Sequence, residues 1–337
     1  MAKLVGVFNT AHSPFCYMPP EQWNQVRASR KLREDVPMDD VEENKRKAQR
    51  IQDAFKVLRD KMEEVKPDVI LIYGDDQYEC FDFSNFPAFA VYVGEDFEGN
   101  LSARDTTLFA QRMAGGGNGE RPAMPRGHLK GHPQLATAIL TGVMKRGFDP
   151  AFSMDMPKPE HGIGHAILRP AESLTDMNTP VIPLLLNCYY APQPTAMRCY
   201  EFGKAVRAAI EEDPSDLRVV AVGSGGLWHT PGNEGAWLDE DFDRNELKFL
   251  EVGDAKGMAE YFDAYKIPGQ DASQDIHERT RQQTGMPGFG GPQGGTREIC
   301  NWIAAAGMAE GSKSTIVDYV PVYSSPIGAA FTYCTDL

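Results

Sequence analysis

The stretch VILIYGDDQYECF, residues 69–81, places five apolar or aromatic residues directly before a cluster of polar side chains. A continuous apolar run of this length is typical of a strand that is buried on both faces of a sheet. Lys66 and Pro67 precede the run, and the polar residues that follow it are Asp75, Asp76 and Gln77. We therefore predict a central strand that ends in two carboxylates and an amide.

The segments around this strand predict a parallel sheet. KLVGVFNT, residues 3–10, has the composition of a first strand, and apolar residues recur near helical spacing over residues 39–65. Strand, crossover helix and strand form the unit from which parallel sheets are built. Further strands are expected within residues 86–95, 179–190, 216–226 and 314–334, helices over 132–145, 195–212 and 296–308, and glycine-rich loops over 113–128 and 284–295. We expect one α/β domain over residues 1–337, with a central mostly parallel sheet flanked by helices.

Composition narrows the possible partners and compartment. The 337 residues are 42% hydrophobic and carry a net charge of −14, which disfavours nucleic acid and anionic membranes as partners. No run of about 18 apolar residues predicts a membrane span, and the N-terminal run is interrupted by Asn9 and Thr10 as in a strand. The six cysteines are scattered without CxxC spacing, which predicts free thiols and a cytoplasmic protein.

Polar side chains gather where the predicted strands end. His12 follows the first strand, Asp75 to Gln77 follow the second, and His161, His165 and His229 lie in later loops. Ligands of open α/β sheets bind outside the carboxyl ends of the strands, so these residues indicate a metal or acid–base site. Each histidine taken alone is more often a solvated or core residue, and short carboxylates often cap turns. No HExxH, Walker or GxGxxG pattern accompanies them.

The order of five motifs carries more information than any one of them. FNTAHSP, DDQYECF, EHG, GSGGLWHTPG and TREICNW follow one another along the chain. In this order they resemble the class III extradiol ring-cleavage dioxygenases, the superfamily of the protocatechuate 4,5-dioxygenase β subunit and of gallate dioxygenases. The resemblance extends from about residue 5 to residue 332. It implies that a non-haem Fe(II), held by two histidines and one glutamate, opens a catechol-like ring with O2.

The resemblance also assigns roles to single residues. His12 matches the first histidine ligand and Glu298 matches the carboxylate ligand. His229 matches the catalytic histidine that moves the substrate hydroxyl proton, a task that suits an imidazole because its pKa lies near working pH. His161 matches a second catalytic position that hydrogen-bonds the substrate or tunes this proton exchange.

One position departs from the family pattern. The second strand of the family usually ends in Asn-Asp-His, and alignment on Phe81 places Gln77 where that iron-binding histidine is expected. An amide oxygen coordinates iron more weakly than an imidazole nitrogen. Three interpretations remain open. Gln77 is itself a ligand, a neighbour supplies the ligand, or the site binds iron poorly and serves another function. The candidate neighbours are Asp75, Asp76, His161 and His165.

The substrate and the partners follow from the same resemblance. A catechol-, gallate- or dihydroxypyridine-like ring is expected, with Arg126, His128, His165 and Arg198 as candidates for substrate binding. The resemblance further implies a homodimer, with a small helical partner subunit as a possibility. Two rival functions remain on the same scaffold. One is a hydrolase in which His229, Asp76 and Glu298 hold a metal-activated water, and the other is a non-catalytic binding protein.

Overall fold

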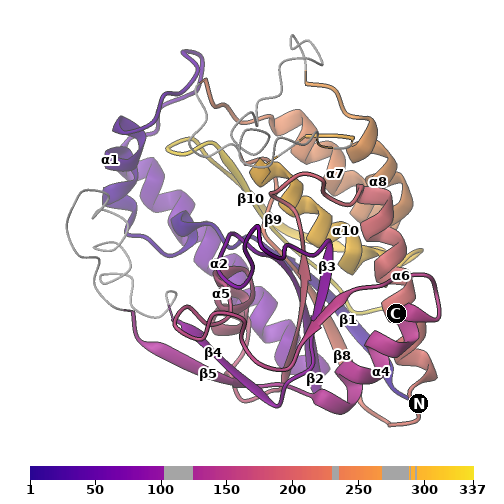
Figure 1. Cartoon of the computed structure of the whole chain (residues 1–337). Coiled ribbons are helices and arrows are strands. Elements are labelled where there is room, and N and C mark those ends of the chain that lie inside the picture. The colour runs from indigo at the N-terminus through magenta and orange to yellow at the C-terminus, as the bar shows by residue number, and fades with distance from the viewer. Residues whose placement is uncertain (102–123, 230–234, 268–287, 289, 293) are drawn as a thin grey trace.

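The computed structural model describes residues 1–101, 124–229, 235–267, 288, 290–292 and 294–337 (Figure 1). Within these residues the core is an eight-stranded sheet with the order β6-β3-β7-β2-β8-β1-β10-β9. The strands are β1 (Lys3–Thr10), β2 (Val69–Asp75), β3 (Phe89–Tyr92), β6 (Ala151–Ser153), β7 (Val181–Leu186), β8 (Arg218–Ser224), β9 (Thr315–Val322) and β10 (Ile327–Cys334). Every residue of β2 is buried, which confirms it as a central strand.

The middle of the sheet is parallel and its edges are mixed. β2 pairs in parallel with both β7 and β8, and β8 pairs in parallel with β1. β3 pairs antiparallel with β7, while β10 pairs antiparallel with β1 and β9. β9 and β10 are separated by only four residues, which permits a hairpin but not a parallel crossover. The prediction of an α/β fold with a mostly parallel central sheet is confirmed.

Helices cover both faces of the sheet (Figure 1). Alternate residues of β2 point to opposite faces, as the pleat of a strand requires. Leu71 and Tyr73 join one hydrophobic cluster, and Ile70 and Ile72 join the other. The first cluster contains residues of α4 (Pro133–Met144), α6 (Ala196–Glu212), α7 (Glu240–Val252), α8 (Ala255–Ala264) and α10 (Ile299–Gly307), and the second contains residues of α1 (Trp23–Ala28), α2 (Val41–Val65) and α5 (His165–Leu174).

Some local predictions need correction. Residues 126–128, expected in a loop, belong to β5 (Arg126–Lys130), which pairs with β4 (Asp96–Asn100) in a separate two-stranded sheet. Alternation of buried and exposed residues along β5 explains why strand geometry is possible there. α2 begins two residues later than predicted, because the side chain of Asp40 accepts the Glu43 amide at 2.7 Å and caps the helix. Most of the two glycine-rich stretches lies outside the described residues.

Two further properties concern the whole of the described chain. Within those residues, no helix is both long enough and apolar enough to span a bilayer. All six cysteines are described, and each is a buried free thiol.

Candidate metal centre

Three neighbouring strands deliver polar side chains to one point. β1, β8 and β2 lie side by side in parallel, so their carboxyl ends meet at one edge of the sheet. His12 follows β1 by two residues, Asp75 is the last residue of β2 and Ser224 is the last residue of β8. Glu298 lies far from these residues in the sequence. It is the last residue of the 3-10 helix η3 (Gly294–Glu298), which directly precedes α10.

These elements bring one imidazole and two carboxylates together. One ligand atom from each of His12, Asp75 and Glu298 lies within 4.8 Å of the other two, and all three residues are buried. His12 Nε2 is 3.2 Å from Glu298 Oε2 and 4.0 Å from Asp75 Oδ1. Among the described residues, this is the one group of three histidine, cysteine or carboxylate side chains whose ligand atoms have metal-ligand spacing.

Surrounding hydrogen bonds orient the three side chains. His12 Nδ1 is 2.9 Å from Ser224 Oγ, which leaves Nε2 directed at the carboxylates. Tyr189 donates its hydroxyl to Glu298 Oε1 at 2.5 Å, and the Gly226 amide donates to Glu298 Oε2 at 3.1 Å. Outer contacts of this kind fix ligand orientation in metal sites. Tyr189 was not predicted from sequence, although it lies just beyond the apolar run that became β7.

A glycine makes the close approach of these groups possible. Gly225 has φ +112°, and a Cβ atom there would stand 2.7 Å from Glu298 Oε2 and 3.1 Å from the His12 ring. An L side chain would therefore be strained and would also displace both groups. The glycines of the GSGGLWHTPG motif thus serve the geometry of the site.

The pKa values of the two buried carboxylates are shifted in opposite directions. Burial, followed by the negative charge of Glu298, raises the pKa of Asp75 to about 7. Burial also acts to raise the pKa of Glu298, but the adjacent His12 outweighs it and holds that pKa well below its usual range. A bound divalent cation would neutralise both carboxylates. One imidazole nitrogen and two carboxylate oxygens can hold a divalent metal such as Fe(II), with one imidazole fewer than the two-histidine, one-carboxylate set that the family resemblance implies.

The raised pKa of Asp75 predicts a pH dependence of stability in the metal-free protein. Its proton is held more tightly in the folded than in the unfolded state, so the stabilising contribution is lost as pH rises through about 7. We expect the melting temperature to fall as pH rises from about 4, near the unfolded-state pKa, to about 7, to level off above pH 7, and this fall to disappear in Asp75→Asn. Thermal melts of metal-stripped protein over this range test it. An equal decline of melting temperature with pH in wild type and in Asp75→Asn would contradict this prediction.

Gln77 lies against the same carboxylates. Its Nε2 donates to Asp75 Oδ2 at 3.1 Å and to Glu298 Oε1 at 3.4 Å. Asp76 turns away, because its carboxylate accepts the Cys80 amide at 2.7 Å and the Phe81 amide at 3.1 Å and thereby caps the following turn. Among the neighbours that the sequence left open, the structure therefore places Asp75 rather than Asp76 with His12 and Glu298.

His165 lies beside the cluster and His161 lies at the surface. The His165 ring packs edge-on against the His12 ring, with 4.8 Å between centroids, and its Nδ1 is 2.9 Å from the Glu79 carboxylate. That ion pair outweighs burial and lowers the pKa of Glu79 to about 2. His161 is exposed in a turn, where its backbone amide donates to Lys158 O at 3.0 Å.

His229 has the properties of a neutral base. Its ring occupies space that a side chain at residue 295 would take, since a Cβ on Gly295 would lie 2.3 Å from Cδ2. Its amide donates to Thr296 Oγ1 at 3.0 Å, next to Glu298 in the chain. Burial lowers the pKa of His229 to about 4, and Nδ1 is buried without a hydrogen-bond partner among the described residues. The imidazole is therefore neutral at pH 7 and has a free nitrogen.

The cationic residues that the sequence suggested for substrate binding are engaged elsewhere. Arg126 donates to Glu98 at 3.1 Å and His128 lies 3.3 Å from Asp96, both on the exposed face of the small sheet. Arg198 donates to Gly147 O at 2.7 Å and lies over the Phe148 ring. None of these contacts reaches His12, Asp75 or Glu298.

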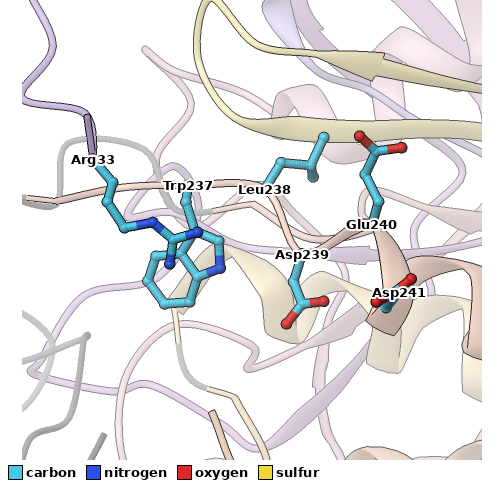
Figure 2. Close-up of a pocket in the computed structure, with 6 residues that line it drawn as sticks. All are labelled: Arg33, Trp237, Leu238, Asp239, Glu240 and Asp241. Atoms are coloured by element: carbon cyan, nitrogen blue, oxygen red, sulfur yellow. The ribbon is translucent and has the colours of Figure 1, made fainter. Parts of the chain in front are cut away.

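An open hollow of about 330 Å³ lies apart from these residues. Figure 2 shows its lining, which consists of Arg33, Trp237, Leu238, Asp239, Glu240 and Asp241. Arg33 stacks on the Trp237 ring at 4.9 Å, and Trp237 in turn packs against Trp228. No residue predicted to hold metal or move protons is among the six lining residues.

Comparison with known proteins identifies the family of this chain. The family model for the catalytic LigB subunit of aromatic ring-opening dioxygenases matches residues 36–332. That range includes Asp75, Gln77, His229 and Glu298 and begins after His12. Among solved structures, an uncharacterized protein from Escherichia coli K12 aligns with 98% of this chain and 99% of its own, at TM-score 0.43 and 12% identity, a likeness too weak to support an argument.

Two curated enzymes illustrate the relationship. A gallate dioxygenase of Pseudomonas putida is 34% identical over 44% of this chain, and the match spans less than half, 42%, of that enzyme. A 2,3-dihydroxyphenylpropionate/2,3-dihydroxicinnamic acid 1,2-dioxygenase of Photorhabdus laumondii is 25% identical over 76% of this chain and 79% of its own. The predicted family is confirmed: this chain belongs to the class III extradiol dioxygenases whose catalytic subunits are of the LigB type.

Proposed function

We propose that this protein is an Fe(II)-dependent extradiol dioxygenase that opens a catechol-, gallate- or dihydroxypyridine-like ring with O2. The observation that carries the proposal is the buried cluster of His12, Asp75 and Glu298 at the carboxyl ends of the central strands. Bound Fe(II) would supply open coordination positions at which a vicinal diol and O2 meet. The substrates in the names of the two curated relatives both carry neighbouring ring hydroxyls, which supports this substrate class.

The roles of the surrounding residues follow from their contacts. His12, Asp75 and Glu298 would hold the metal, while Tyr189 and the Gly226 amide keep the Glu298 carboxylate in place. His229, neutral and with a free buried nitrogen, would accept the proton of a substrate hydroxyl and later return it. His165 would support the His12 ring and face the substrate from that side. Hydrogen bonding of the substrate by His161 remains a prediction.

Oxygen consumption tests the proposed activity directly. Protein reconstituted with Fe(II) without oxygen should, after mixing with air-saturated buffer and a panel of catechols, gallates, aminophenols and dihydroxypyridines, take up one O2 per ring opened. Turnover that proceeds equally without O2 would instead support the metal-dependent hydrolase. Stoichiometric binding without turnover would support the non-catalytic binding protein, for which the glutamine at residue 77 is the motivating observation.

The contacts of the Gln77 amide lead to a separate prediction about metal affinity. Because Gln77 supports both carboxylates, Gln77→Ala should weaken Fe(II) binding by about 10- to 100-fold, as the loss of supporting residues does elsewhere. Gln77→His should tighten binding, since imidazole is the better iron ligand. Competition with a colorimetric chelator measures both. Unchanged affinity in both variants would remove Gln77 from the site.

Assembly and location complete the proposal. We propose a cytoplasmic homodimer, with a small helical partner subunit as an alternative assembly. Six free buried thiols support a reducing compartment. Light scattering of the purified protein, alone and after co-expression with a candidate small helical subunit, measures the mass of the assembly.

A further inference from the structure

Arg30 differs from the other arginines of its segment. Arg27 donates to three backbone carbonyls, of Val36, Pro37 and Tyr323, at 2.8 to 2.9 Å. Arg33 pairs with Asp35 at 2.5 Å. The Nε of Arg30, in contrast, is buried and has no hydrogen-bond partner among the described residues. Arg30 thus holds a donor out of water without using it.

An anion would supply the hydrogen-bond acceptor that Arg30 lacks. A buried donor that lacks its hydrogen bond is destabilising, and more so when the group is charged. Partial burial lowers the pKa of the Arg30 guanidinium. A carboxylate could pair with the guanidinium through two parallel hydrogen bonds and satisfy the buried Nε.

The backbone places Arg30 next to the segment that carries His229. The backbone amide of Gly235 donates to Lys31 O at 2.8 Å, the backbone amide of Arg33 donates to Ala236 O at 3.0 Å, and Leu32 forms a bridge with Ala236. His229 itself forms a bridge with Ile327, at the start of β10. The charge of Arg30 is near enough to contribute to lowering the pKa of His229, after burial and the neighbouring His12. The guanidinium therefore lies on the side of the site where the proposed base is located.

We propose that Arg30 binds a carboxylate group of the aromatic substrate and so selects carboxylated over neutral catechols. This inference rests on the proposed function, because it presumes that a catechol-like ring lies between His229 and the cluster of His12, Asp75 and Glu298. A guanidinium suits the task, since its planar fork matches both oxygens of a carboxylate. Arg30 thereby takes the role that Arg126 and Arg198 were expected to fill.

Paired ligands separate this role from a structural one. Calorimetry under anaerobic conditions would compare 3,4-dihydroxybenzoate with 4-methylcatechol on the Fe(II)-loaded wild-type protein, Arg30→Gln and Arg30→Lys. We expect Arg30→Gln to weaken binding of the carboxylate by about 10- to 100-fold, the value of a charge-assisted hydrogen bond, and to leave the neutral catechol unchanged. Arg30→Lys should restore part of the difference. Arg33→Gln, a matched loss of charge three residues away, should change neither ligand.

Thermal stability supplies a second readout. Because Arg30 is unpaired without ligand, Arg30→Gln should melt at the same or a higher temperature than ligand-free wild type, whereas loss of a structural arginine would lower it. Equal weakening of both ligands, no weakening of either, or a lowered melting temperature would overturn the inference and leave the dioxygenase intact. A wild-type protein that binds neither ligand would overturn the inference, and one that also takes up no O2 with any member of the panel would overturn the proposed function.

Discussion

Replacing Glu298 by alanine should remove Fe(II) binding and oxygen uptake together. The carboxylate is buried, 3.2 Å from His12 Nε2, and held by Tyr189 and the Gly226 amide, so its loss leaves one imidazole and one carboxylate for the metal. We expect Fe(II) affinity to fall by more than about 100-fold, the upper end of what loss of a supporting residue costs. Iron content after gel filtration and the oxygen electrode measure the two effects.

A second consequence identifies the cause of that loss. The charge of Glu298 helps to raise the pKa of Asp75, so Glu298→Ala should lower that pKa and flatten the decline of melting temperature with pH in metal-free protein. Glu251→Ala, which removes an exposed carboxylate from α7, should match wild type in every assay. Normal iron content in Glu298→Ala would refute the assignment of Glu298 as a ligand.

Replacing His229 by asparagine should stop turnover while iron and substrate still bind. Loss of a general base costs about 10²- to 10⁴-fold in rate. Burial lowers the pKa of His229 to about 4, so the wild-type imidazole is already the basic form throughout the neutral range. The rate deficit of His229→Asn should therefore be constant across that range, as steady-state kinetics at several pH values would show.

His132→Asn is the matched control for this variant. His132 caps α4 by accepting the Leu135 amide at 3.2 Å, and asparagine is also a good cap, so this exchange should leave turnover unchanged. A His229→Asn protein that turns over at the wild-type rate would rule out His229 as the base. Loss of iron from that variant would assign the histidine a role in metal binding instead.

Local sequence patterns were sufficient for the framework of the molecule. The apolar run of residues 69–73 forms a buried central strand because five such side chains in sequence can be satisfied only when both faces of the strand are covered. The order of the motifs was sufficient for the family and singled out His12 and Glu298, which the fold brings together at one edge of the sheet, and His229, whose amide bonds Thr296 two residues before Glu298. These conclusions depend on residue type and order, which the sequence contains.

The choice among chemically equal neighbours required the tertiary structure. Asp75 and Asp76 are adjacent and identical in type, but Asp75 ends β2 and points to the cluster, whereas Asp76 begins the next turn and accepts the Cys80 amide, a difference that only the structure shows. The arginines pose the same problem: charge alone suggested Arg126, whereas packing pairs that residue with Glu98 and leaves Arg30 unpaired beside the segment of His229. Contacts between residues far apart in the chain depend on how the elements pack, and a local pattern carries no record of that packing.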